Sequence, residues 1–209
     1  MSGTEPEAFV AECEALEATL NEVPEEAWQR QALGEWTLAE LAAHITRGAG
    51  RLAEQAHDDP GGDRPVRDRV SYWQVDRLAD APPIAARARD AAVGVDPSEW
   101  PARFAGAWRA SADTFERIGP EALIATLRGP MRAVEYLATR VVEVVVHHYD
   151  VRAALDLPPA GTPEAERLTM DILEALLPGA RPRNFGRRRF ILAATGRLEV
   201  DDPRFPVLQ

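Results

Sequence analysis

The sequence predicts an all-α protein built around a four-helix bundle, with a small C-terminal appendage made of a helix and an extended segment. Four long segments carry apolar residues at helical spacing, and the connections between them are rich in Pro and Gly. Long helices joined in this way favour a bundle, in which each helix buries one apolar face against its neighbours. We expect the bundle to occupy residues 1–157 and the appendage residues 158–209.

The ends of the four bundle helices are marked by capping and breaking residues. The first helix is expected over 7–20, before Asn21. The second begins at Thr37, whose hydroxyl can cap the helix while Glu40 returns the bond, as in a capping box. The other two are expected over 98–118, before Gly119-Pro120, and over about 131–155, before Pro158-Pro159.

Shorter elements are expected between and after these helices. Residues 57–66 read as a loop, 81–92 as a further helix and 122–127 as a short extended or helical connection. After Gly161 the composition changes: a helix is expected over 163–176, followed by an Arg-rich stretch, the Thr195-Gly196-Arg197 segment and a Pro-rich tail.

Composition excludes several classes of function. The net charge is −10, which argues against a nucleic-acid or anionic-membrane binder, because both need a basic face. Every basic residue is Arg, so Schiff-base and P-loop lysines are absent. Cys13 is the only cysteine, and its helical apolar neighbours predict a buried, inert thiol. With neither a secretory signal nor a membrane-length apolar run, the cytoplasm is the expected location.

The fourth helix carries the most informative pattern, because Glu143 and His147 lie four residues apart among five valines. Residues at i and i+4 share one face of a helix. A carboxylate–imidazole pair in such apolar surroundings costs desolvation energy unless something compensates it. The spacing leaves two compensators open: a divalent metal or an ordinary buried hydrogen bond.

His44 on the second helix is the candidate third partner. In a bundle, inward side chains of different helices can meet at one point, and such folds build metal sites in this way. Two imidazoles and one carboxylate leave coordination positions free for water or substrate, which is typical of catalytic rather than structural sites. Zinc is the first candidate, although iron, nickel, cobalt and manganese accept the same ligands.

The other polar and aromatic residues near this pattern have two interpretations each. Asp150 can support His147 or form a surface charge pair, and His148 is expected at a boundary or facing solvent. His57 is expected on the surface of its loop. Trp108 and Trp73 can line a pocket, although aromatic residues more often pack in the core.

Two motifs resemble the mycothiol-dependent maleylpyruvate isomerase family, which belongs to the DinB-like group of metal-binding four-helix bundles. The first is Trp36-Thr37 followed by Leu41 and His44, and the second is Glu143-x-x-x-His147-x-x-Asp150. The resemblance covers roughly residues 5–157. It implies that His44, Glu143 and His147 bind a metal, typically zinc, and that mycothiol serves as cosubstrate. The Arg-only, Ala-rich composition agrees with a GC-rich actinobacterial host.

The resemblance also reaches the appendage, where Ala193-Ala194-Thr195-Gly196-Arg197 is similar to a segment found late in relatives. It implies a catalytic arginine, for which Arg197 is the candidate. Isomerases proper carry a larger C-terminal domain than the fifty or so residues here, so the resemblance extends to thiol transfer rather than to maleylpyruvate as the substrate.

Further arginines are candidates for binding a carboxylate, because the guanidinium group binds carboxylates in a bidentate manner. Arg140 is a second catalytic candidate, and Arg109 with Trp108 is expected to contribute to cofactor binding. Ion pairs offer the alternative: Glu143 or Glu135 for Arg140, and Asp113 for Arg109, each within the same helix.

The sequence therefore predicts a metal-dependent, mycothiol-using thiol transferase or isomerase that acts on a small electrophile. Its partners are expected to be small molecules, with neither nucleic acid nor membrane among them. Two alternatives remain: a metal-assisted hydrolase on the same bundle, and a non-catalytic metal- or ligand-binding stress-response protein. The oligomeric state is left open.

Overall fold

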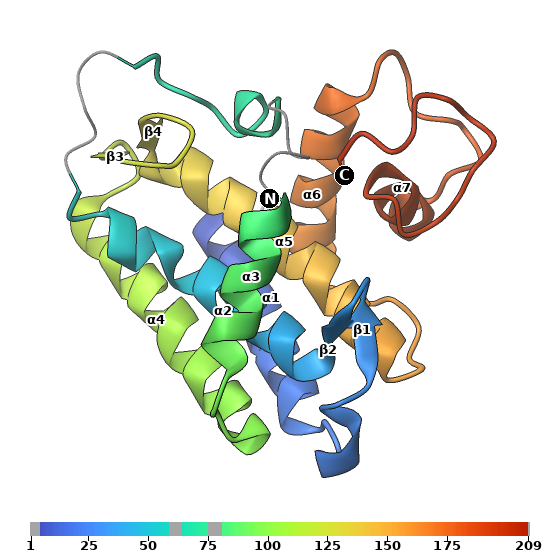
Figure 1. Cartoon of the computed structure of the whole chain (residues 1–209). Helices are drawn as coiled ribbons and strands as arrows, with labels where there is room; N and C mark the ends of the chain where they lie inside the picture. The colour runs from blue at the N-terminus through green and yellow to red at the C-terminus, as the bar shows by residue number, and fades with distance from the viewer. Residues whose placement is uncertain (1–4, 59–63, 75–80, 209) are drawn as a thin grey trace.

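The computed structural model describes residues 5–58, 64–74 and 81–208 of the chain. Four long helices form the expected bundle, which confirms the prediction of an all-α fold (Figure 1). Helix α2 packs against α4 and α5, and α1 packs against the same two helices, so each helix of the bundle has two neighbours. The four helices are α1 (Glu5–Asn21), α2 (Leu38–Gln55), α4 (Trp100–Ile118) and α5 (Ala133–Ala154).

Helix α5 is buried on nearly all sides, because α1, α2 and α6 (Pro163–Leu176) pack around it. Val141, Val142, Val144 and Val145 are each at most 2% exposed. A helix that is apolar all round belongs in a core, and its polar side chains must find partners inside the protein. Within the described ranges, no helix has a stretch long and apolar enough to cross a membrane.

Helices α2 and α4 approach each other closely, because small residues lie at their contact. A Cβ atom added to Gly50 would come within 3.4 Å of the Ala107 Cβ. The Ser111 hydroxyl donates a hydrogen bond of 2.6 Å to the carbonyl oxygen of Ala49. This contact fixes the position of α2, the helix that carries His44.

The N-terminus of α2 is held by the predicted capping box. The Thr37 hydroxyl accepts a hydrogen bond from the Glu40 backbone N–H at 3.2 Å, and the Glu40 carboxylate accepts one from the Thr37 N–H at 2.8 Å. A short antiparallel pair, β1 (Gln31–Leu33) and β2 (Trp36–Thr37), leads into it through Gly34, whose φ of 56° favours glycine. This pair was not predicted, because two- and three-residue strands have no usable period.

A short helix and several one-turn or two-residue elements lie in the remaining connections. Helix α3 (Ala81–Ala92) confirms the expected helix and packs against α2. The segment predicted over 122–127 includes β3, which pairs antiparallel with β4 just before α5. The other short elements are η1 (Glu25–Ala27), η2 (Ser71–Trp73), η3 (Pro97–Glu99), β3 (Leu123–Ile124) and β4 (Met131–Arg132). Residues 59–63 of the predicted loop lie outside the described residues.

The C-terminal extension contains two helices rather than one. Helix α6 confirms the first, and α7 (Arg187–Ala194) replaces part of the segment that was expected to be extended. Three arginines open α7 and mask its helical period, but Phe190, Ile191, Ala193 and Ala194 are all buried. Helix α6 packs against α5 and α1, and α7 packs against α6. The division of the chain at residue 157 stays a prediction.

A buried polar network joins the extension to the bundle, and it overturns the expectation for His148. That side chain is only 3% exposed, because α1 covers the side of α5 on which it lies. Its Nδ1 lies 2.7 Å from Glu12 Oε1, and its Nε2 lies 2.9 Å from the Thr19 hydroxyl. The other Glu12 oxygen accepts a hydrogen bond of 2.6 Å from the Thr162 backbone N–H.

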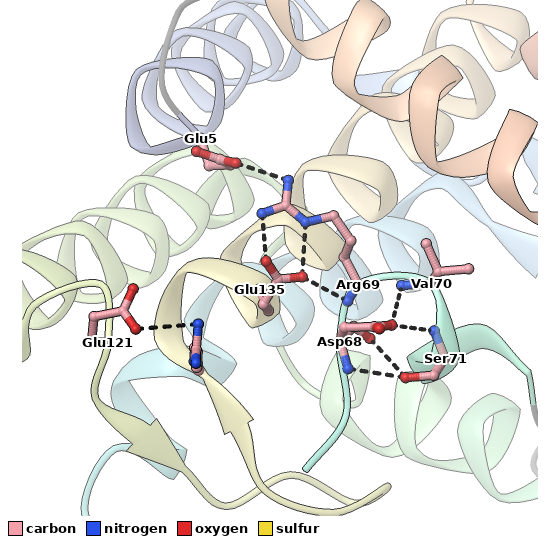
Figure 2. A network of polar contacts seen from close by, with 8 residues as sticks. Glu5, Asp68, Arg69, Val70, Ser71, Glu121 and Glu135 are labelled. Atoms are coloured by element: carbon pink, nitrogen blue, oxygen red, sulfur yellow. Dashed lines mark hydrogen bonds and ion pairs between the residues drawn. The ribbon is translucent and has the colours of Figure 1, made fainter.

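Arg69 anchors the segment that contains η2 to the start of α5. Figure 2 shows its guanidinium between Glu135 and Glu5, with two hydrogen bonds of 2.8 and 2.9 Å to Glu135 and one of 2.8 Å to Glu5. The Arg69 backbone N–H donates a further bond to Glu135, and Asp68 accepts bonds from the backbone that follows it, including one of 2.7 Å from Ser71. This anchor positions Tyr72 and Trp73 at the end of the same segment.

The Arg69–Glu135 pair predicts a pH-dependent contribution to stability. The hydrogen bonds from Arg69 outweigh burial and hold the pKa of Glu135 below its ordinary value of 4.5. Such a carboxylate stabilises the fold above its unfolded-state pKa, and this contribution is lost as the pH falls through the folded-state pKa. We expect Glu135→Gln to lower the free energy of unfolding, measured with urea at pH 7, and to cost progressively less below about pH 4.5.

Glu116→Gln is the matched control, because Glu116 is exposed on α4. An equal cost of Glu135→Gln at pH 7 and at the lowest pH where both proteins still fold would contradict the assignment.

Candidate metal centre

The two histidines and the glutamate singled out by spacing meet at one point between α2 and α5. His147 Nε2 lies 3.3 Å from Glu143 Oε2, and His44 Nε2 lies 4.0 Å from the same oxygen. One ligand atom from each residue lies within 4.8 Å of the other two. The two imidazole rings meet edge to face, with 4.9 Å between their centroids. Metal binding by this triad stays a prediction, and the convergence of the three donors supports it.

Asp150 and Arg197 hold His147 from behind. His147 Nδ1 lies 2.9 Å from Asp150 Oδ2, and Arg197 donates to both oxygens of Asp150 at 2.8 and 3.1 Å. A carboxylate on Nδ1 keeps the proton on that nitrogen, so the lone pair of Nε2 points toward Glu143 and His44. Arg197 comes from the C-terminal extension and also donates to the Thr195 carbonyl at 2.7 Å.

The pKa shifts of the triad favour a neutral His44 and a charged Glu143, while His147 holds a proton that a metal ion would replace. Burial, assisted by the charge of His147, lowers the pKa of His44 to about 3, so this imidazole is neutral near pH 7. Burial alone would raise the pKa of Glu143, but the hydrogen bond with His147 and the charge of Arg140 hold it well below its ordinary value. Burial opposes a proton on His147, yet Asp150 and Glu143 outweigh it and raise its pKa. The same two carboxylates would attract a metal ion.

Arg140 lies one turn before Glu143 and is buried, with 5% of its surface exposed. It donates 3.1 and 3.2 Å hydrogen bonds to the hydroxyls of Tyr72 and Thr139, and its guanidinium lies 4.7 Å from the centre of the Tyr136 ring. Glu143 and Glu135 were the proposed partners of Arg140 within its helix, but among the described residues neither forms a hydrogen bond with it. The hydrogen-bond partners of Arg140 are therefore neutral, and the nearby Glu143 carboxylate offsets its charge without a hydrogen bond.

Two cavities flank Glu143, and Trp73 lines both of them. The smaller is about 50 Å³ and reaches His147, Arg197 and Leu208. The larger, here called the arginine cavity, is about 120 Å³ and reaches His44. Its arginines are Arg47, Arg51, Arg87, Arg128 and Arg140. The candidate ligands thus face open space on two sides, as a site that must admit a reactant requires.

Trp108 and Arg109 do not join this site. The Trp108 indole N–H donates a hydrogen bond of 2.9 Å to the Glu17 carboxylate on α1. The Arg109 guanidinium lies 3.1 Å from the same carboxylate, and it also stacks over the Trp108 ring, 4.4 Å from the ring centre. Neither residue lines the two cavities at Glu143. The structure thus gives no support to their predicted role in cofactor binding. The ion pair of Arg109 was expected with Asp113 of the same helix, but its partner in the structure is Glu17 of α1.

Trp73 fits both of its interpretations, because it is 5% exposed in the core and also lines both cavities. Cys13 is fully buried and His57 is exposed, as expected. Tyr72, Arg47 and Arg51 also line the larger cavity and were not predicted. These two arginines follow His44 by three and seven residues, the helical spacing of a shared face, so their positions carried a usable signal. Trp36 packs its ring 4.9 Å from that of His44.

The support of His147 by Asp150 predicts an effect on metal affinity. Asp150→Asn keeps the shape of the side chain but removes the charge that orients and polarises the imidazole. We expect the affinity for zinc, measured by competition with a chelator, to fall roughly 10- to 100-fold. Asp113→Asn, at an exposed position of α4, is the control. An unchanged affinity would show that Asp150 does not support a metal ligand.

Comparison with known families identifies the bundle. The family model described as the mycothiol maleylpyruvate isomerase N-terminal domain matches residues 9–152, which is more than half of the chain. Curated proteins and solved structures give no match. The matched range contains His44, Glu143, His147 and nearly all of the four bundle helices. The chain therefore belongs to the mycothiol maleylpyruvate isomerase N-terminal domain family.

Proposed function

We propose that this protein is a metal-dependent thiol transferase or isomerase that uses mycothiol and acts on a small electrophile. The observation that carries this proposal is the convergence of His44, Glu143 and His147 beside two cavities. Family membership supports the link to mycothiol-related isomerisation. Fold alone would not suffice, because function belongs to the site.

The donor set fits a divalent metal, with zinc as the first candidate. Two imidazole nitrogens and one carboxylate oxygen would hold the ion and leave a position for a further ligand. When bound, a metal of this kind lowers the pKa of a thiol and so supplies the thiolate nucleophile near neutral pH. Asp150 keeps the Nε2 lone pair of His147 directed at the site, and Arg197 holds Asp150 in turn.

The thiol must come from outside the chain. Cys13 is the only cysteine, and it lies in α1 with none of its surface exposed. Burial, together with the charges of Glu12, Glu17 and Glu14, raises the pKa of its thiol well above the ordinary value. A buried, protonated thiol is a poor nucleophile. A thiol mechanism in this fold therefore needs a small-molecule thiol such as mycothiol.

The reaction of such a thiolate with a conjugated double bond has two outcomes. The thiolate forms a C–S bond to one alkene carbon, and the π electrons move onto the conjugated carbonyl oxygen. Rotation about the former double bond, followed by cleavage of the C–S bond, returns the thiolate and gives the isomer. If a proton is added to the carbon next to the carbonyl first, the C–S bond is retained and the product is an S-conjugate.

The proposal is tested by following the loss of the electrophile in the zinc-loaded protein, with and without mycothiol and over a panel of electrophilic acids, because conjugation consumes the thiol whereas isomerisation returns it. We expect thiol-dependent turnover in the wild type and in His57→Ala, whose histidine is exposed in a loop. His147→Ala should lose activity by roughly a hundredfold or more, because several kcal/mol of charge stabilisation is removed.

Mass spectrometry of the products separates isomerisation from conjugation. Hydrolysis by the loaded protein without any thiol would favour a metal-assisted hydrolase instead. If the loaded protein binds no thiol, the proposed function is wrong.

A further inference from the structure

We infer that Tyr72 is a catalytic hydrogen-bond donor, whose hydroxyl binds the substrate oxygen that becomes negatively charged when the thiolate adds. The inference rests on the proposed function and deepens it, because it names the group that stabilises the intermediate of that reaction. It comes from the orientation of one hydroxyl group in the wall of the arginine cavity.

The hydroxyl oxygen of Tyr72 accepts a hydrogen bond, which determines where its own proton can point. Arg140 donates this bond at 3.1 Å, and a guanidinium group has no acceptor with which to return it. The O–H bond of Tyr72 is therefore directed away from Arg140, and within the described residues no acceptor is found for it. Both residues line the cavity that also reaches His44 and Glu143, so a ligand there can accept the bond.

The positive charge of Arg140 makes this hydroxyl a stronger donor. The guanidinium is buried, and its hydrogen bond to the phenol oxygen draws electron density away from the O–H bond. Hydrogen bonds arranged in such a chain strengthen one another, and each is stronger where water is excluded. A second guanidinium, that of Arg128, lies over the Tyr72 ring, 5.2 Å from its centre. Negative charge that develops at this hydroxyl would thus be stabilised by two cations.

The phenol ring of Tyr72 is held in place by its neighbours. The rings of Trp73 and Tyr136 meet it edge to face, with centroids at 5.1 and 6.0 Å. Its backbone N–H donates a hydrogen bond of 3.0 Å to the carbonyl oxygen of Asp68, next to the Arg69 anchor. Donors that are already in position when charge develops are the most effective at stabilising a transition state. Tyr72 meets this requirement without any rearrangement of the segment.

The proposed reaction needs a donor of this kind. When the C–S bond forms, the π electrons of the conjugated system move onto the carbonyl oxygen, which then carries the negative charge. Tyr72 donates a hydrogen bond to this oxygen and keeps its proton, so the electron pair can return when the C–S bond breaks. In conjugation, the same bond stabilises the intermediate until a proton from solvent is added to carbon. The substrate class is therefore a small α,β-unsaturated carbonyl compound whose carbonyl oxygen faces Tyr72.

The other two tyrosines do not offer the same group. Tyr136 also lines the cavity, but only 1% of its surface is exposed, compared with 9% for Tyr72. The Tyr149 hydroxyl donates a hydrogen bond of 2.7 Å to Glu166, and this residue lines neither cavity at Glu143. Tyr149→Phe is therefore the matched control, because it removes a buried phenol hydroxyl away from the site.

The first measurement needs neither thiol nor turnover. The probe is para-nitrophenolate, which carries a single charge on an oxygen bonded to an unsaturated carbon, as the intermediate does. It is titrated into the purified protein at about pH 8 and followed by its absorbance. We expect Tyr72→Phe to weaken binding about tenfold, the usual effect of losing one charge-assisted hydrogen bond. Tyr149→Phe should bind the phenolate as the wild type does, and circular dichroism checks that both variants are folded.

The second measurement is turnover of the zinc-loaded protein with mycothiol. Tyr72→Phe should lower kcat roughly a hundredfold, the usual cost of removing one oxyanion donor, while the affinity for zinc stays at the wild-type value. The inference is overturned if Tyr72→Phe binds the phenolate as tightly as Tyr149→Phe, or if the two variants turn over at the same rate. A wild type that binds the phenolate through Tyr72 but shows no thiol-dependent turnover would contradict the proposed function, whereas the assignment of Tyr72 as an oxyanion donor would hold.

Discussion

The Glu143–His147 pair is a carboxylate and an imidazole on a helix that is buried on nearly all sides, and their side chains are 23% and 10% exposed, so the surroundings of the site follow from this partial burial. Desolvation of two polar groups must be compensated by charged or hydrogen-bonding partners. His44 arrives from α2, and Asp150 supports the far side of His147. Asp150 belongs to α5 itself, but His44 and the Arg197 that holds Asp150 come from elements distant in sequence, so the site forms only when the bundle and the extension pack together.

The C-terminal extension takes part in this arrangement through Arg197. Its guanidinium holds both oxygens of Asp150, which in turn holds His147. On the opposite side of the site, the Arg69–Glu135 anchor brings Tyr72 to Arg140 and Trp73 to both cavities. The site is thus built by the bundle but shaped by the segment before α3 and by the residues after α7.

The sequence predicted the parts of the structure that depend on local chemistry. The capping box at Thr37 and the spacing of Glu143 and His147 were readable because each involves residues within one turn of a helix. His148 was misplaced because its burial depends on α1 and on Glu12, which lie far away in the chain. Trp108 and Arg109 were assigned to the site for their residue types, whereas Glu17 of α1 determines where they lie.

The most direct test of this account is a metal titration of the purified protein and of its His44→Ala, Glu143→Gln and His147→Ala variants, with His57→Ala as the control. One divalent ion should bind per chain in the wild type and the control, and each of the three ligand variants should weaken binding sharply while remaining folded. If the wild-type protein binds no divalent metal, or if the three variants bind as tightly as the control, then the triad is only a buried hydrogen-bonded cluster and the account is wrong.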